Sequence, residues 1–248
     1  MKILITGASS TLGKNLTSEL LKTQQFSIRL LEHRSPVSKE SCEVFQGGLQ
    51  DIDSLSKACF EIDTVVHLAA LTHSSSGKAY FEINEAGTKK IITACENNHV
   101  RRFILVSSVA ATEEGGDYGV SKLRCEELVR KSGLDWVILR PSEVYGVNME
   151  EGIGKLVAWM EKFPIIPVIG DGSYFLSPVS VNDVVQVMVE ILKDDSIKKE
   201  TLNLCGPEKM TMNELINRLA QIQKVQIKKI FLPIWFVRLG IGVLAVFK

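Results

Sequence analysis

Short apolar runs alternate with segments that carry hydrophobic residues at helical spacing through the first part of the chain. The apolar runs predict strands at Lys2–Ile5, Phe26–Leu31, Glu43–Gln46, Thr64–Leu68, Arg102–Val106 and Trp136–Leu139. The helical spacing predicts helices at Leu12–Lys22, Asp51–Phe60, Asn84–Asn97 and Tyr118–Lys131. This alternation is typical of parallel strands joined by right-handed crossovers, with helices on both faces of the sheet. The sequence therefore predicts an α/β fold with a doubly wound parallel sheet over residues 1–150.

The pattern changes after about residue 150. Helical spacing continues at Glu151–Lys162, Val181–Leu192 and Met212–Gln221, and Leu202–Cys205 reads as a strand. Prolines and glycines predict an irregular stretch with one short apolar run after the first of these helices, at Pro164, Pro167, Gly170 and Gly172. We expect residues 151–248 to form a small C-terminal α/β lobe, with the Val179–Leu192 region packing back on the sheet domain.

The segment Phe231–Phe247 is apolar apart from Arg238. A membrane-spanning helix needs about 20 apolar residues, and Pro233 also counts against one. The sequence favours an amphipathic helix that packs on the body of the protein or in a homodimer. Peripheral contact with a membrane through residues 231–248 is the alternative.

Composition narrows the class of protein. The 29 basic and 29 acidic residues give a net charge of +0, which argues against a basic nucleic-acid-binding surface over the whole chain. The five cysteines are scattered and form no CxxC pair, so the sequence predicts reduced thiols and no metal site. The apolar run at Met1–Ile5 is too short for a signal peptide. We therefore predict a cytoplasmic protein.

The segment Thr6–Gly13 lies between the first predicted strand and the first predicted helix. Gly7 suits a tight turn and Gly13 suits close packing of helix on strand, while Ser10 replaces the middle glycine of a GxxGxxG pattern. A helix N-terminus in this position binds pyrophosphate through its backbone N–H groups and dipole. The sequence thus predicts a Rossmann-type dinucleotide site made by Gly7, Ser9, Ser10, Thr11, Leu12 and Gly13.

Three polar residues close the second predicted strand. An acid such as Glu32 binds the adenosine ribose hydroxyls of NAD, whereas basic groups such as His33 and Arg34 favour the 2′-phosphate of NADP. Both kinds are present, so the cofactor is predicted as NAD(P), with a slight preference for NADP.

A catalytic group is predicted where the fifth strand ends and the next helix begins. Tyr118 and Lys122 are four residues apart, so one helical face carries both. A phenol is a poor base at neutral pH because its ordinary pKa is about 10, but a neighbouring ammonium group stabilises the phenolate. Ser108 follows the fifth strand and is placed to hydrogen-bond a reacting oxygen.

Several segments resemble the extended short-chain dehydrogenase/reductase superfamily, in its NAD-dependent epimerase/dehydratase branch. They are the Gly loop, His67–Ala70 (HLAA), Asn84–Thr88 (NEAGT), the Tyr118–Lys122 pair, Leu139–Gly146 (LRPSEVYG) and Gly170–Gly172 with Val179–Val184. The resemblance implies that Tyr118 is the acid/base, that Lys122 binds the nicotinamide ribose and that Ser108 orients the substrate oxygen. It adds further cofactor-binding residues at Gly48, Leu49, Leu68, Ala69, Ala70, Pro141 and Val144.

The chain also departs from the family pattern. Gly48 stands where an acid reaching the adenine is usual, and Phe175–Leu176 stand where nucleotide-sugar enzymes often carry arginine. The resemblance implies hydride transfer between NAD(P) and a hydroxyl or carbonyl carbon, most readily of a nucleotide sugar. The alternative is a catalytically silent NAD(P)-binding protein, similar to the Rossmann-type accessory subunit of respiratory complex I.

Overall fold

The computed structural model describes residues 1–38, 41–147, 149 and 151–233. Two compact units make up the chain, the first comprising Met1–Ser142 with Val181–Leu204 and the second comprising Glu143–Ser180 with Cys205–Lys248. The sequence predicts a boundary near residue 150, with the Val179–Leu192 region packing back on the sheet domain. Of the apolar segment predicted as a helix, residues 234–248 lie outside the described part of the chain.

The first unit is built on a seven-stranded sheet with the order β11-β6-β5-β4-β1-β2-β3. Its strands are β1 (Lys2–Thr6), β2 (Ser27–Glu32), β3 (Glu43–Gln46), β4 (Thr64–His67), β5 (Arg102–Val106), β6 (Asp135–Pro141) and β11 (Glu200–Leu204). Every neighbouring pair is parallel. The carboxyl ends of the strands therefore lie at one edge, where ligands bind in folds of this kind.

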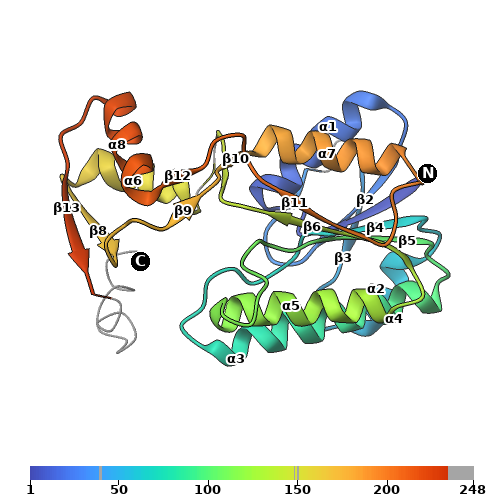
Figure 1. Cartoon of the computed structure of the whole chain (residues 1–248). Helices are drawn as coiled ribbons and strands as arrows, with labels where there is room; N and C mark the ends of the chain where they lie inside the picture. The colour runs from blue at the N-terminus through green and yellow to red at the C-terminus, as the bar shows by residue number, and fades with distance from the viewer. Residues whose placement is uncertain (39–40, 148, 150, 234–248) are drawn as a thin grey trace. The chain divides into compact units, whose positions relative to one another are not determined.

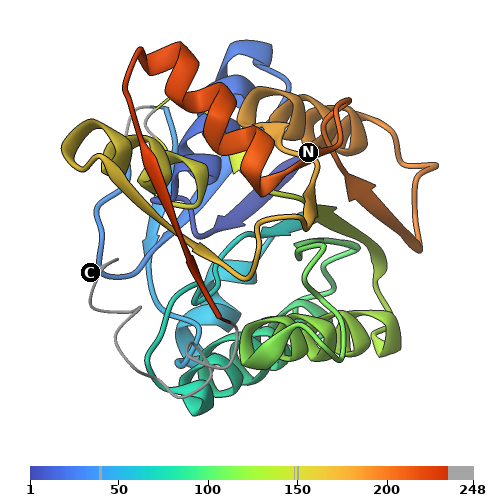
Figure 2. The ribbon, with the colours of Figure 1, turned by 60° about the vertical axis from the view of Figure 1, so that its left-hand side comes forward.

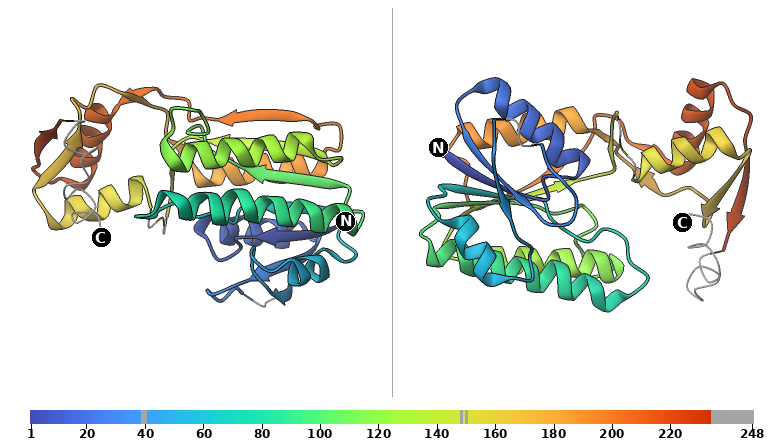
Figure 3. Two further views of the ribbon diagram at one scale, coloured as in Figure 1. Left: turned by 90° about the horizontal axis from the view of Figure 1, so that it is seen from below. Right: turned by 180° about the vertical axis from the view of Figure 1, so that it is seen from behind.

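Helices cover both faces of this sheet, as Figure 1 shows. The helices are α1 (Thr11–Thr23), α2 (Ile52–Cys59), α3 (Gly77–Tyr80), α4 (Ala86–Asn97), α5 (Gly116–Lys131) and α7 (Val181–Lys193). Helices α1 and α7 pack together on one face, and α2, α4 and α5 lie on the other (Figure 1). Seen from below, α4 and α5 run side by side (Figure 3). The predicted doubly wound parallel sheet is confirmed.

The strands form because their side chains are buried on both faces. Ile3, Leu4 and Ile5 of β1 are fully buried, and so are Val65 and Val66 of β4. Near-continuous apolar strands of this kind are typical of parallel sheets that helices cover on both sides. The core therefore follows from the same apolar runs that predict the strands.

One helix begins earlier than its pattern predicts. The helical segment is expected to start at Asn84. In the structure it starts with α3 and continues through a π-helical turn, Phe81–Glu85, that contains Asn84 and leads directly into α4. A π turn inserts an extra residue into the helical repeat and so breaks the apolar spacing that locates a helix in a sequence.

The second unit contains short strands around two helices. Its elements are β7 (Val144–Tyr145), α6 (Ile153–Lys162), β8 (Ile165–Ile169), β9 (Phe175–Leu176), β10 (Val179–Ser180), β12 (Met210–Thr211), α8 (Met212–Gln223) and β13 (Lys228–Leu232). Strands β8 and β13 pair in parallel. Figure 2 gives a second view of these two strands with α6 and α8. Met160, Ile166, Val168 and Ile216 form the core of this unit.

The strands of this unit correct two predictions. The stretch expected to be irregular contains strand β8, whose Pro167 pairs with Ile230 of β13. Phe231 and Leu232, assigned above to a terminal helix, belong to strand β13. A two-stranded sheet has only edge strands, which tolerate proline and carry little periodic signal in the sequence.

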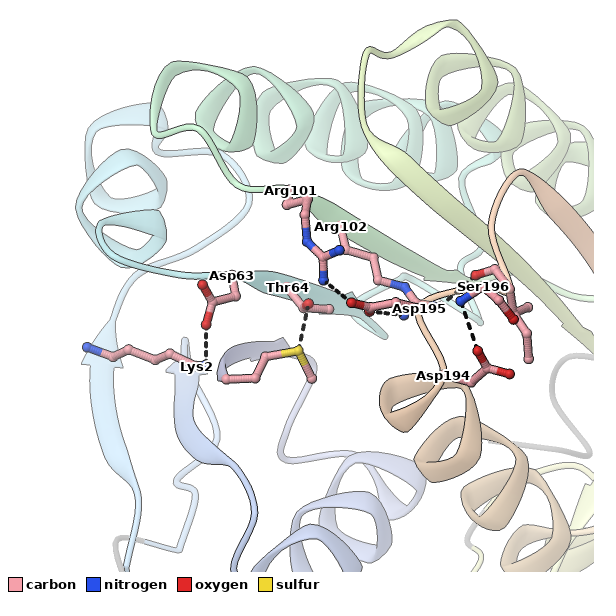
Figure 4. Close-up of polar contacts among 10 residues, drawn as sticks. Lys2, Asp63, Thr64, Arg101, Arg102, Asp194, Asp195 and Ser196 are labelled. Carbon is pink, nitrogen blue, oxygen red and sulfur yellow. Dashed lines mark hydrogen bonds and ion pairs between the residues drawn. The ribbon is translucent and has the colours of Figure 1, made fainter.

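A buried arginine and its exposed partners join elements at the amino edge of the large sheet, opposite its carboxyl edge (Figure 4). Arg102 at the start of β5 is 1% exposed and donates hydrogen bonds to Asp195 Oδ1 (2.9 Å) and to the Ile197 carbonyl (2.7 Å). Arg101 bonds the other oxygen of Asp195 at 2.7 Å. These bonds tie the segment after α7 to the central strands.

None of the helices in the described ranges has the length and apolar character needed to cross a bilayer.

Candidate active site

The predicted phosphate loop joins β1 to α1 as a closed turn. The Ser10 N–H donates to the Gly7 carbonyl at 3.0 Å, and Gly7 has a φ of +73°, which favours glycine. Ser10 is the N-cap of α1, and its hydroxyl accepts a hydrogen bond from the Gly13 N–H at 3.1 Å. Thr11 and Leu12 form the first turn of α1. The turn therefore presents the N-terminal end of α1 at the carboxyl edge, where an anion is favoured.

Close backbone contacts leave no room for a side chain at the two glycine positions of this loop, Gly7 and Gly13. A Cβ on Gly7 would lie 2.6 Å from the Ala69 nitrogen, and a Cβ on Gly13 would lie 2.5 Å from the Gly7 carbonyl oxygen. The Leu68 N–H also donates to the Thr6 carbonyl at 3.1 Å. The structure thus brings the predicted residues Leu68 and Ala69, with Ala70 next in the chain, against the phosphate loop. This cradle fits a dinucleotide whose pyrophosphate approaches the backbone.

The ends of β2 and β3 lie side by side at the carboxyl edge, and we call the group of residues around Glu32 there the Glu32 corner. The Glu32 carboxylate accepts a hydrogen bond from the Val37 N–H at 2.7 Å and another from the Gln46 side-chain amide. His33 and Arg34 are exposed. A Cβ on Gly48 would lie 2.7 Å from Cδ2 of His33, so the imidazole rests directly against that glycine. The next residue, Leu49, packs on Gly87 of α4.

Lys122 is buried where β5 ends. Its side chain is 3% exposed, and its Nζ donates a hydrogen bond to the Val106 carbonyl at 2.8 Å. Burial lowers the pKa of the Lys122 ammonium, while Cys125 and Glu126 act in the opposite direction. The ammonium group therefore lies at the last residue of a central strand, two residues before Ser108.

The loop that carries Ser108 presses on the start of α5. A Cβ on Gly119 would lie 2.1 Å from the Ala110 carbonyl oxygen, and so would a Cβ on Gly115. The Ser108 hydroxyl accepts a hydrogen bond from the Ala110 N–H at 3.1 Å. Tyr118, next to Gly119, is partly exposed and contacts the Tyr80 ring edge-on, with 5.9 Å between ring centroids. The structure thus places Lys122 at the end of β5, Ser108 in the loop that follows this strand, and Tyr118 on the turn of α5 that packs against this loop.

Two further predicted cofactor residues belong to strands other than β5. Pro141 ends β6, where its carbonyl accepts a hydrogen bond from the Val109 N–H at 3.1 Å, next to Ser108. Val144 belongs to the second unit, in β7, which pairs with β10. In that unit Phe175 is 61% exposed, and the Lys209 ammonium lies 4.5 Å from the centre of its ring.

Comparisons with known proteins agree with this geometry. The sequence profile of a family described as NAD(P)H-binding matches residues 7–195. The chain belongs to this family. The chain is also a member of the extended short-chain dehydrogenase/reductase group of epimerases and dehydratases.

Individual relatives are distant in sequence but similar in fold. The UDP-glucose 4-epimerase of Vibrio cholerae is 26% identical, over 96% of this chain and 80% of the relative. N-acetyl-alpha-D-glucosaminyl-diphospho-ditrans,octacis-undecaprenol 4-epimerase of Escherichia coli O157:H7 is also 26% identical, over 93% of this chain and 75% of the relative. A solved structure of UDP-glucuronic acid 4-epimerase from Bacillus cereus with NAD is 25% identical, with a TM-score of 0.83 over 94% of this chain and 88% of that one.

A carboxylate that the motif analysis does not single out holds the NAD(P)H-binding edge together. Glu126 of α5 is fully buried and accepts hydrogen bonds from Ser107 Oγ (2.6 Å), from Arg140 Nε and Nη2 (2.8 and 2.6 Å) and from Arg130 Nη2 (2.7 Å). Burial alone would raise the pKa of the Glu126 carboxyl, but these hydrogen bonds lower it below its ordinary value. Its spacing of four residues after Lys122 places Glu126 on the helical face of the predicted catalytic pair, but its bonds to Arg140 of β6 leave no signal in the sequence.

Asn84 is a second positioning residue of the same edge. Its side-chain amide accepts a hydrogen bond from the Leu71 N–H at 2.7 Å and donates to the Leu71 carbonyl (3.1 Å) and to Ser121 Oγ (3.1 Å). The motif analysis treats Asn84 as a helix start. The structure places it in the π turn, where it ties the loop after β4 to α5. π turns are frequent at functional sites.

His67 lies beneath the loop and links three elements. Its Nδ1 is hydrogen-bonded to Thr6 Oγ1 of β1 at 2.7 Å, and its Nε2 to Thr88 Oγ1 of α4 at 3.2 Å. Burial, with the charge of Lys122 adding to it, lowers the pKa of His67 from 6.5 to about 3. The imidazole is therefore neutral at physiological pH and serves the packing of the edge.

This lowered pKa predicts a loss of stability in mild acid. Between the ordinary pKa of 6.5 and the folded-state value of about 3, the unfolded chain binds a proton at His67 that the folded chain does not. Lowering the pH from 6.5 to 5 should therefore reduce the free energy of unfolding by about 2 kcal/mol through this residue. Above about pH 7.5 this contribution is nearly constant, because His67 is then neutral in both states.

Urea unfolding at pH 7 and pH 5 measures the effect. The variant His67→Gln should lose less stability between the two pH values than the wild type does, and the exposed-residue control His73→Gln should behave as the wild type. An equal pH dependence in His67→Gln and the wild type would contradict the assignment.

Proposed function

We propose that this protein is an NAD(P)-dependent enzyme that moves a hydride between the nicotinamide and a hydroxyl or carbonyl carbon of a nucleotide sugar. The observation that carries the proposal is the buried Lys122 ammonium bound at the end of β5, two residues before Ser108 and one helical turn after Tyr118, on the same sheet edge as the phosphate loop. The relatives described above are named as enzymes, so a catalytically silent protein is not favoured.

Each group has a distinct task in this proposal. When bound, the cofactor supplies a nicotinamide that accepts or returns the hydride. The Tyr118 phenolate takes the proton of the substrate hydroxyl at its Oη when the hydride leaves, and the neutral phenol gives a proton to the carbonyl oxygen in the reverse direction. The Lys122 ammonium stabilises the phenolate by its charge. The Ser108 hydroxyl donates a hydrogen bond to the reacting oxygen and so fixes its position.

The phosphate loop and the Glu32 corner bind the rest of the cofactor in this proposal. Gly7 and Gly13 let the pyrophosphate approach the backbone, with Ser9 to Leu12 around the start of α1. Glu32 binds the adenosine ribose. Its carboxylate is already held by the Val37 N–H, so a 2′-phosphate would meet a fixed negative charge. We therefore propose NAD as the preferred cofactor, contrary to the slight preference for NADP that the sequence suggests.

The substrate class rests on the relatives. The epimerases of Vibrio cholerae and Bacillus cereus are named for UDP-glucose and UDP-glucuronic acid. In the second unit, Phe175 and Leu176 stand in place of the expected arginine, and Lys209 supplies a cation beside Phe175. We propose that Lys209 compensates for the missing arginine. A homodimer, and membrane contact through residues 231–248, stay predictions.

Proton NMR of the purified protein with UDP-glucose, UDP-glucuronic acid or dTDP-glucose tests the function. With NAD we expect conversion of at least one sugar into its 4-epimer or into a 4-keto product, and slower conversion with NADP. Absorbance of NADH at 340 nm separates the reactions, because an epimerase releases no reduced cofactor and a dehydrogenase accumulates it. Binding of NAD without conversion of any of these sugars would contradict the substrate class.

A further inference from the structure

Two residues, His33 and Gly48, lie against each other at the carboxyl edge, beside the ends of β2 and β3. His33 directly follows β2, and Gly48 lies two residues after the end of β3, the neighbouring parallel strand. The position that a Cβ on Gly48 would take is 2.7 Å from Cδ2 and 3.0 Å from Nε2 of the His33 ring. A Cβ at residue 48 and the imidazole of His33 in its present position cannot both be accommodated, so any side chain at residue 48 has to displace the imidazole.

The backbone on both sides of this pair is held in place. The Gly47 N–H donates to the Glu32 carbonyl at 2.9 Å, which joins the two strand ends. The Asp51 N–H donates to the Gly48 carbonyl at 3.0 Å, and Lys90 Nζ of α4 donates to the Gln50 carbonyl at 2.8 Å. The imidazole thus rests on a fixed surface, while the residue itself is exposed to a ligand.

We infer that His33 is the adenine-recognising residue of this site, with Gly48 as the glycine that makes room for its ring. The inference rests on the proposed function, because it assumes that NAD lies along this edge. In such folds the adenosine half lies over the ends of the first strands and the nicotinamide half over the later ones. His33 is next to Glu32, the residue proposed to bind the adenosine ribose, so the base comes within its reach.

The chemistry of the two partners agrees. Adenine presents its 6-amino group as a hydrogen-bond donor, and a neutral imidazole nitrogen is an acceptor. The Nε2 atom of His33 lies 3.0 Å from the position that a Cβ on residue 48 would take. The imidazole therefore supplies, from β2, the polar group that β3 lacks in this chain.

Isothermal titration calorimetry with NAD, ADP and nicotinamide mononucleotide tests the inference. We expect His33→Ala to weaken the binding of NAD and ADP about tenfold, the size of a lost hydrogen bond with its packing, and to leave nicotinamide mononucleotide unchanged. Gly48→Ala should show the same loss because its methyl group displaces the ring. Gly133→Ala is the matched control, because a Cβ there meets nothing within 4 Å.

Nicotinamide hypoxanthine dinucleotide, which lacks the 6-amino group, separates hydrogen bonding from packing. The wild type should bind NAD more tightly than this analogue, and His33→Phe should bind the two equally. If His33→Ala bound ADP with the same affinity as the wild type, the inference would be overturned and the proposed function would stay intact. Failure of the wild type to bind either NAD or ADP would overturn both. Since His33 is exposed, its variants are expected to fold even where Gly48→Ala does not.

Discussion

Replacing Tyr118 with phenylalanine is expected to lower kcat by about a hundredfold to ten-thousandfold, the range that a positioned proton-transfer group supplies. The substitution removes only the phenolic hydroxyl, so the ring keeps its edge-on contact with Tyr80. The binding of NAD should not change, because the phosphate loop and the Glu32 corner lie on other elements. Initial rates by NMR on the converted sugar, together with calorimetric titration of NAD, measure the two quantities.

Tyr80→Phe is the matched control for this substitution. The Tyr80 hydroxyl accepts a hydrogen bond from the Ser74 N–H at 2.8 Å and donates to the Thr72 carbonyl at 3.4 Å, so it holds a loop. Its removal should lower kcat by less than about tenfold, as expected for one lost neutral hydrogen bond. If Tyr118→Phe turned over the substrate as fast as Tyr80→Phe does, another group would have to carry the proton.

Much of the first unit could be predicted from the sequence because its signals are local. The buried strands are apolar runs such as Lys2–Ile5, and the phosphate loop needs glycine at positions where a side chain cannot fit. Tyr118 and Lys122 share a helical face, which fixes their relation whatever the rest of the fold does. For these features the sequence pattern and the packing depend on the same residues.

The features that were missed depend on contacts between distant segments. Strand β13 exists because it pairs with β8, and neither strand is long enough to show a clear alternation. The role of Glu126 depends on Arg140, which comes from a different strand, and no spacing in the sequence joins the two. The contact of His33 with Gly48 arises in the same way, from the register of β2 against β3. Tertiary pairing of this kind leaves no periodic trace.

Glu126→Ala is expected to lower the free energy of unfolding by about 3 to 5 kcal/mol, the usual cost of removing one partner of a buried ion pair. The substitution leaves Arg140 and Ser107 without the carboxylate that joins α5 to the ends of β5 and β6. Urea unfolding at pH 7 measures the loss. Glu127→Ala is the matched control on the same helix, because Glu127 is exposed and its removal should change stability by less than about 0.5 kcal/mol.

A double-mutant cycle separates the ion pair from the cavity that alanine creates. The guanidinium of Arg140 reaches both oxygens of Glu126, at 2.8 and 2.6 Å, so the two residues should be strongly coupled. We expect Glu126→Gln and Arg140→Met each to destabilise the protein, and the double variant to lose less than the sum of the two by about 1 to 3 kcal/mol. Additive losses would mean that Glu126 acts through packing alone. Coupled losses would mean that the charged hydrogen bonds between Glu126 and Arg140 hold α5 against β6.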